Sequence, residues 1–111
     1  MTGEVTERPI AVAILAAATG SGTSDTFRVG TSPVSVRLLG AAAVLAGAEV
    51  VQIQYQDAGA NWHDYIHAQL GNMQLVATET AITIYDTGIY RATKTATAAS
   101  TGLEMVGRDY C

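Results

Sequence analysis

Two histidines four residues apart, His63 and His67, are the side chains best suited to holding a metal ion. Imidazole nitrogens bind zinc and nickel, so a shared ion is the most specific chemistry that this spacing suggests. In a strand, however, residues 63, 65 and 67 share one face and the two histidines lie about 13 Å apart, too far for one ion. We therefore expect no metal site, and we interpret His63, Tyr65 and His67 as a polar and aromatic outer face available to a partner.

Catalytic residues are equally hard to assemble from this sequence. Ser24 and Asp25 are adjacent, but the sequence has no Gly-x-Ser-x-Gly nucleophile motif, and its single cysteine, Cys111, is its last residue. A single cysteine also excludes an intrachain disulfide and a zinc site made of four cysteines. The glycine-rich residues 20–24 lack the lysine of a phosphate-binding loop. We expect no catalytic residues and no cofactor, and hence a protein that is not an enzyme.

The charge of the chain and the length of its apolar stretches each disfavour one further class of partner. Six Lys and Arg residues stand against ten Asp and Glu, a net charge of −4. The cations are scattered, and phosphate neutralisation needs clustered cations, so we expect no nucleic acid partner. The longest apolar stretches, residues 10–18 and 40–47, fall short of the roughly 20 residues that span a bilayer, so we expect no membrane partner.

The elements that carry these residues are predicted to be strands, because the apolar pattern has a period of two wherever it is clear. In residues 50–56, for example, apolar residues alternate with glutamines. Turn residues separate such segments at short intervals, without a helical pattern between them. The Ala-rich residues 40–46 are ambiguous, since alanine favours helix. We predict strands at residues 9–18, 24–29, 33–39, 48–56, 61–68, 73–78, 81–85, 89–95 and 103–107.

These strands predict an all-β fold, a single antiparallel β-sandwich or flattened barrel of about eight short strands. Residues 1–8 hold several charges and no apolar pattern, which predicts a flexible N-terminal arm. The single domain is then expected at residues 9–111.

The most informative motif is the turn Asp57-Ala58-Gly59-Ala60-Asn61-Trp62 between two of these strands. We expect Gly59 to supply a positive φ and the Asp57 carboxylate to accept hydrogen bonds from amides two or three residues further on. Trp62 would close the hairpin by packing its indole on the adjoining strand. The role predicted for Asp57, Gly59 and Trp62 is therefore structural.

This turn resembles the Asp-box hairpin, an Asp-x-Gly-x-x-Trp pattern found in sialidase propellers and many unrelated β-proteins, where it is structural. More broadly, residues 48–94 resemble small β-sandwich proteins encoded among the structural genes of tailed bacteriophages. The shared pattern is a strand of alternating hydrophobic residues and glutamines, the Asp-x-Gly-x-x-Trp turn, a glycine-containing loop, a strand ending at Thr83-Ile84-Tyr85, and then Gly88-Ile89-Tyr90-Arg91.

The resemblance implies a virion protein, made in the host cytoplasm and carried on the outer capsid surface. Such proteins decorate or cement the head shell, which implies the major capsid protein as partner. The resemblance also implies a homo-oligomer, with a trimer favoured. A neck or tail component is an alternative within the same virion context.

The low charge of the chain favours burial in an assembly. Only 14% of the residues are charged, against about a quarter in most domains. Small uncharged residues occupy faces that the alternation predicts to be outward, and interfaces of permanent assemblies are depleted of charge at their centres. The candidate interface comprises the arm residues Glu4, Glu7 and Arg8 together with His63, Tyr65, His67 and Arg91.

A function of another class is a carbohydrate-binding or adhesive β-sandwich. Its stacking platforms would be Trp62, Tyr65, Tyr85 and Tyr90. An aromatic content of only 6% disfavours this alternative, and Trp62 already has a role in closing the hairpin.

Overall fold

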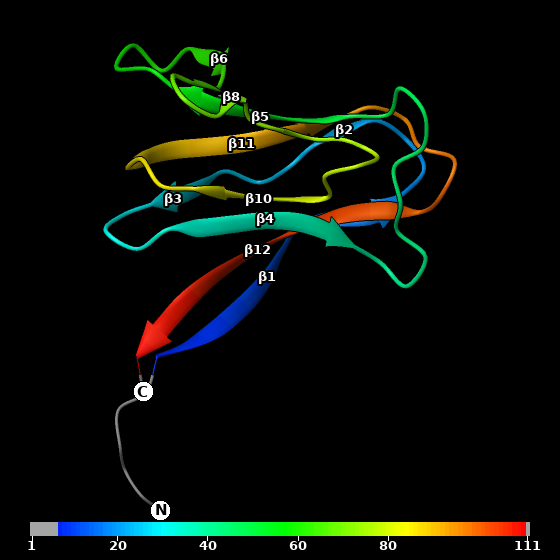
Figure 1. Ribbon diagram of the computed structural model, residues 1–111, viewed down its shortest axis with the longest axis horizontal. Helices are drawn as coiled ribbons and strands as arrows, with labels where there is room; N and C mark the ends of the chain where they lie inside the picture. The colour runs from blue at the N-terminus through cyan, green and yellow to red at the C-terminus, as the bar shows by residue number, and fades with distance from the viewer. Residues whose placement is uncertain (1–6, 111) are drawn as a thin grey trace, which may run out of the picture.

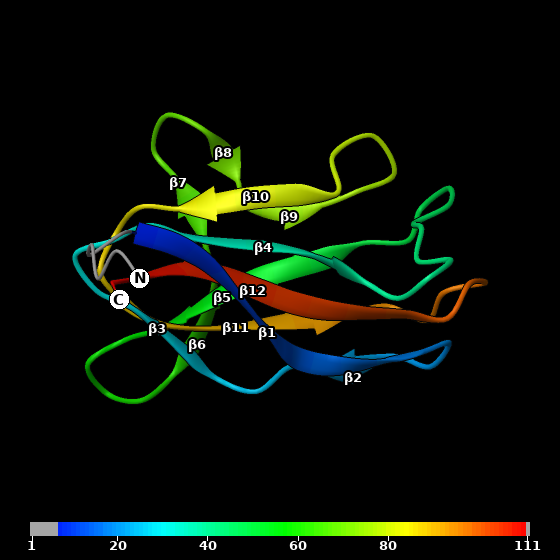
Figure 2. The same cartoon turned by 90° about the horizontal axis from the view of Figure 1, so that it is seen from below.

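The computed structural model describes residues 7–110, which form two antiparallel β-sheets around a shared core and a small separate hairpin (Figure 1 and Figure 2). The predicted all-β fold class is confirmed. No helix among the described residues is long and apolar enough to cross a membrane. The strand segments, in chain order, are β1 (Glu7–Ala18), β2 (Gly22–Thr23), β3 (Phe27–Val29), β4 (Val34–Leu39), β5 (Val51–Gln56), β6 (Trp62–Asp64), β7 (Ile66–His67), β8 (Gly71–Asn72), β9 (Gln74–Leu75), β10 (Ala81–Ile84), β11 (Gly88–Lys94) and β12 (Thr101–Tyr110).

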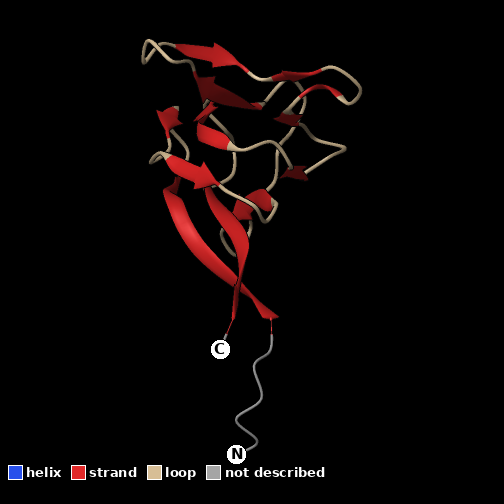
Figure 3. Cartoon of the chain, turned by 90° about the vertical axis from the view of Figure 1, so that its left-hand side faces the viewer, coloured by secondary structure: helices blue, strands red, loops and turns tan. Residues whose placement is uncertain are grey.

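The first sheet has four strands in the order β1-β12-β4-β10. β1 and β12 pair along almost their whole length, whereas β4 pairs with β12 only from Gly102 to Val106. The ends of β1 and β12 therefore continue beyond the rest of the sheet as a two-stranded ribbon, which Figure 3 shows below the body of the protein.

The start of β1 corrects the predicted extent of the flexible arm. Glu7 and Arg8, its last two residues, belong to β1 and pair with Tyr110 and Asp109 of β12. These two residues are held in the strand by backbone pairing with β12, from the other end of the chain, so no local apolar pattern predicted it. The remainder of the arm, which includes Glu4, lies outside the described residues.

The crossing of β1 over β12 requires a glycine. The register of β1 shifts twice, between Ala13 and Leu15 and between Leu15 and Ala18, so this part of the strand bulges. A Cβ atom on Gly102 would lie 2.6 Å from the Ala17 nitrogen and closer still to the Leu15 carbonyl oxygen. The two backbones can approach this closely only because residue 102 has no side chain.

The second sheet has the order β2-β11-β5-β6, with β3 pairing to β11 beside β2 and β9 pairing to β5 beside β6. Its central strand β5 shows the predicted alternation. Val51 and Ile53 are fully buried, whereas Gln52 and Gln54 lie half-buried on the opposite face. The inward residues meet those of the four-stranded sheet, such as Leu103, in one hydrophobic core.

The structure has more segments than the roughly eight predicted, because β2 and β8 lie outside the predicted strands and the predicted strand 61–68 is divided. The predicted strand 61–68 is interrupted at Tyr65. The Tyr65 N–H donates to the Ile53 carbonyl at 2.9 Å, and the Tyr65 carbonyl accepts from the Met73 N–H at 2.9 Å. The chain thus leaves β5 at this residue and enters the separate β7–β8 hairpin.

The predicted strand 73–78 is shortened, and only β9 remains of it. Val76 and Glu79 bond to each other through both backbone groups, at 2.9 and 3.0 Å, and close a tight turn. The ambiguous residues 40–46 contain turns rather than a helix, because two helical turns between glycines are too short to be stable alone.

Candidate functional site

The turn that follows β5 is organised by one carboxylate. The Asp57 Oδ1 atom accepts hydrogen bonds from the Gly59 N–H at 2.8 Å and the Asn61 N–H at 2.9 Å. The predicted capping role of Asp57 is therefore confirmed, with partners two and four residues further on. The expected role of Gly59 is wrong, since the positive φ, 67°, belongs to Ala60. Glycine suits position 59 because a Cβ there would lie 3.1 Å from the Asn61 side-chain nitrogen.

His63 joins this turn through its ring nitrogen. Its Nε2 atom lies 2.7 Å from the Asp57 Oδ2 atom, and this hydrogen bond, aided by those from Asn61 and Gly59, lowers the pKa of Asp57 from 3.8 to about 2. Asp57 therefore remains an acceptor at all but strongly acidic pH.

Four side chains on the outer face of the six-stranded sheet form one chain of contacts across three strands, and we call them the Arg91 face: Gln54, Trp62, Asp64 and Arg91. The guanidinium carbon of Arg91 lies 4.4 Å from the centre of the Trp62 ring. Arg91 Nε donates to Gln54 Oε1 at 2.9 Å, and Gln54 Nε2 donates to Asp64 Oδ1 at 3.0 Å. Trp62 thus reaches across β5 to β11, instead of packing on the adjoining strand as predicted.

An aromatic cluster occupies the opposite side of the same strands. Tyr55 stacks on His63 with ring centres 5.3 Å apart, and Tyr65 meets Tyr55 and His67 edge to face at 6.2 and 6.3 Å. Residues 63, 65 and 67 therefore gather on one side, as their spacing predicts. The interpretation of all three as an outer face is wrong for Tyr65, which is only 8% exposed. The cause is that this side of the sheet faces the core, where Tyr65 packs on Tyr90 at 5.3 Å.

Asp86 satisfies the two buried phenols. The Tyr65 hydroxyl donates to the Asp86 carboxylate, and the Tyr90 hydroxyl donates to the Asp86 carbonyl oxygen at 2.9 Å. Burial raises the pKa of Tyr65 and of Tyr90, and the negative charge of Asp86 raises both further. Both phenols are therefore neutral donors. Sequence reasoning missed Asp86 as a partner, because the Asp86-Thr87-Gly88 segment signals only a turn.

The two histidines are each bound within their own turn. His63 contacts Asp57, and His67 Nδ1 accepts from the Gln69 and Leu70 N–H groups, both at 3.1 Å. In the part of the chain that the structure describes, no three His, Cys, Asp or Glu residues are grouped closely enough to hold a metal ion.

The four aromatic residues considered as carbohydrate platforms do not form a shared exposed surface. Tyr65 and Tyr90 are buried, and Trp62 is half-buried with Arg91 over its ring. Only Tyr85, at 61% exposure, presents its ring freely. The side chains of the interface residues Glu7 and Arg8 lie outside the described part of the structure, and Arg91 is half-buried.

The fold defines an all-β sandwich domain, and comparison with known proteins supports that description. No protein-family model matches the chain, and no curated protein was found as a relative. Among solved structures, the chain is similar to the SPBc2 prophage-derived protein YomS, with a TM-score of 0.64 and 12% sequence identity. The similarity covers 94% of this chain and 96% of that one. At this identity, it establishes a shared fold along almost the whole chain.

Proposed function

We propose that this protein is a structural component of a tailed-phage particle and decorates the head shell by binding the major capsid protein. The observation that carries the proposal is the Arg91 face, a polar sheet surface whose side chains already hold one another in place. The likeness in fold to a prophage-derived protein is consistent with a phage origin.

The physical argument concerns what a partner would meet on this face. Arg and Trp are enriched in protein interfaces, and most charged residues are depleted at interface centres. Side chains that are already fixed lose little conformational entropy on binding, so more of the contact energy is retained as affinity. The hydrogen bonds between Gln54, Asp64 and Arg91 supply such prior order.

In this proposal the protein binds and does not catalyse, and it holds no cofactor. Its place is the outer surface of the particle, after synthesis in the host cytoplasm. A homo-oligomer, with a trimer favoured, would present several copies of the same face and raise avidity for a repeating shell. Neither nucleic acid nor membrane is a partner.

The first test is to count copies of this chain on purified particles of the phage that encodes it. Quantitative peptide mass spectrometry gives the ratio to the major capsid protein. A ratio of one, or a simple fraction of it, supports decoration of the whole shell. A few copies per particle would move the protein to the neck or tail, and absence from particles would overturn the proposal.

A second test addresses the face itself. Arg91→Ala removes the contact with Trp62 and the hydrogen bond to Gln54, and we expect weaker retention on particles. The matched control is Arg37→Ala, which removes a half-exposed arginine from the other sheet, where it pairs with Glu104. Equal retention of the two variants, with both folded by circular dichroism, would remove the Arg91 face from the interface.

A further inference from the structure

Strand β10 has one open edge. It pairs with β4 from Ala81 opposite Arg37 to Ile84 opposite Val34, and no strand among residues 7–110 pairs with its other side. In an antiparallel sheet, alternate residues of such a strand direct their N–H and C=O groups away from the neighbour. These groups are a template for one more strand.

Little in the sequence of β10 protects this edge. Natural edge strands are commonly guarded by lysine, proline or a bulge. The sequence Ala81-Ile82-Thr83-Ile84 has no charge and no proline, and its pairing with β4 is regular. Only the shortness of the strand limits unwanted pairing.

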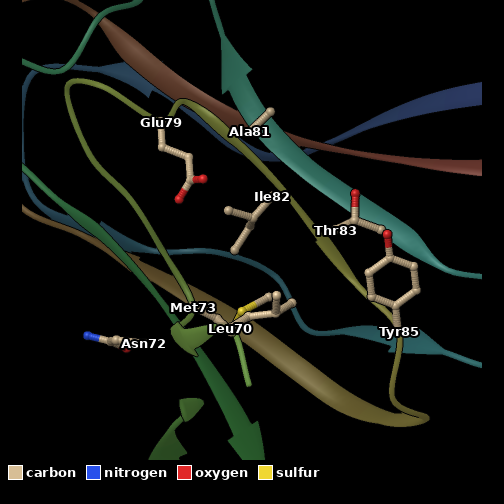
Figure 4. A pocket seen from close by; sticks show the side chains of 8 residues that line it. All are labelled: Leu70, Asn72, Met73, Glu79, Ala81, Ile82, Thr83 and Tyr85. Atoms are coloured by element: carbon tan, nitrogen blue, oxygen red, sulfur yellow. The ribbon is translucent and has the colours of Figure 1, made fainter. Parts of the chain in front are cut away.

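A hollow of about 300 Å³ lies along this edge, between β10 and the end of the β7–β8 hairpin (Figure 4). Ile82 points across it toward Leu70 and Met73, and the buried Met73 forms an apolar floor. Leu70 and Tyr85 are 60% and 61% exposed at its rim, although both are large and apolar. Such a surface beside an open strand favours an extended segment over a compact ligand.

The charge of the hollow indicates which segment fits. The Glu79 carboxylate points into it from the end opposite Tyr85 (Figure 4), and it makes no hydrogen bond or ion pair with the side chains of residues 11–107, which the structure describes. A cation is the complementary group. Each of the six cations of this chain lies in a strand already paired within the fold. Among residues 7–110, a second copy therefore offers no Lys or Arg on an unpaired segment, which favours a different protein.

We propose that the β10 edge receives an extended segment of the partner protein as a further strand of the four-stranded sheet. Side chains two residues apart in a strand point to the same face. The segment therefore has the pattern apolar-x-basic, with the apolar side chain against Leu70, Met73 and Ile82 and the basic one at Glu79. The partner's identity as the shell protein rests on the proposed function, whereas the segment's chemistry follows from the hollow.

The test is a titration of the ¹⁵N-labelled protein with the peptide acetyl-Thr-Val-Thr-Val-Thr-Lys-Thr-amide, followed by NMR. We expect shift changes centred on Ala81–Ile84 and residues 70–73. A peptide with Glu in place of Lys should bind about tenfold more weakly, because an attraction becomes a repulsion. Two further peptides carry N-methyl groups on alternate amides, one on the odd-numbered residues and the other on the even-numbered residues. Only one of these two sets of amides faces β10, so the peptide methylated on that set should lose binding altogether.

A charge swap supplies the decisive control. In Glu79→Lys, the preference should reverse, so that the Glu peptide binds more tightly than the Lys peptide. Asp25→Lys makes the same change in net charge at an exposed residue outside the hollow and should keep the original preference. Equal binding of both peptides to the unmodified protein, or shift changes elsewhere, would overturn the proposal. So would self-association without peptide that Glu79→Lys abolishes, because the occupant would then be a second copy.

The outcome also separates this inference from the proposed function. Protein present on particles but indifferent to the peptides would leave decoration intact and refute the β10 site. Peptide binding by a protein absent from particles would support the site and refute the shell protein as its partner.

Discussion

Two tight places in this fold are maintained by different forces. At the crossing of β1 and β12, Gly102 is required because any side chain would overlap the backbone at Leu15 and Ala17. At the turn after β5, one exposed carboxylate, Asp57, holds two backbone amides and His63 by hydrogen bonds. A steric overlap does not change with pH, whereas the hydrogen bonds to a carboxylate weaken when the carboxylate becomes protonated. The difference predicts how each place responds to mutation.

The largest effect is expected at the crossing. Gly102→Ala forces the backbones of β1 and β12 apart, and we expect it to lower the free energy of unfolding by about 3 kcal/mol. Urea denaturation measures the change. The matched control is Gly107→Ala in the same strand, where a Cβ meets nothing within 4 Å. It should change stability by no more than about 0.5 kcal/mol, and a similar loss in both variants would refute the steric account.

Tyr65 lies between the two extremes, since it is a buried group bonded to an exposed carboxylate. Tyr65→Phe keeps the packing on Tyr90 and removes only the hydroxyl that donates to Asp86. Because water can reach the Asp86 carboxylate, we expect a loss of only about 1 kcal/mol in thermal or urea unfolding. Tyr85→Phe removes an exposed hydroxyl and should leave stability unchanged. A loss as large as that of Gly102→Ala would show that Asp86 is shielded from water.

A smaller effect of opposite sign is expected within the Asp57 turn. Ala60 has a φ of 67°, a conformation that strains residues with a side chain. Ala60→Gly relieves this strain but adds freedom to the unfolded chain, and we expect a net gain of about 0.5 kcal/mol. Ala58→Gly adds the freedom without relieving strain, so it should lower the free energy of unfolding slightly. A loss at both positions would mean that the turn tolerates Ala60 without cost.

The pH dependence gives the smallest but most diagnostic difference. Because the folded-state pKa of Asp57, about 2, lies below its usual 3.8, its contribution to stability is complete above pH 3.8 and is lost as pH falls toward 2. The difference in unfolding free energy between the unmodified protein and Asp57→Asn should therefore shrink across this range. The loss caused by Gly102→Ala should stay constant over the same range. A constant difference for Asp57→Asn would contradict the role of the carboxylate charge.

Local patterns predicted much of the fold because strand alternation and turn chemistry act over a few residues. The alternation of residues 50–56 placed Val51 and Ile53 inside, and the capping role of Asp57 followed from its position before glycine. The same reasoning failed for Tyr65, because alternation tells which residues share a face but not which face meets the other sheet. It also failed for Asp86, whose partner Tyr65 is 21 residues away.

The sequence by itself determined the all-β class, most of the strand positions and the carboxylate-capped turn. The tertiary structure decided the pairing of β1 with β12, the contact of Trp62 with Arg91 across β5 and the open edge of β10. These features depend on residues far apart in the chain, and the packing of two sheets around one core determines which of them meet. Periodicity along one strand contains no information about its neighbour.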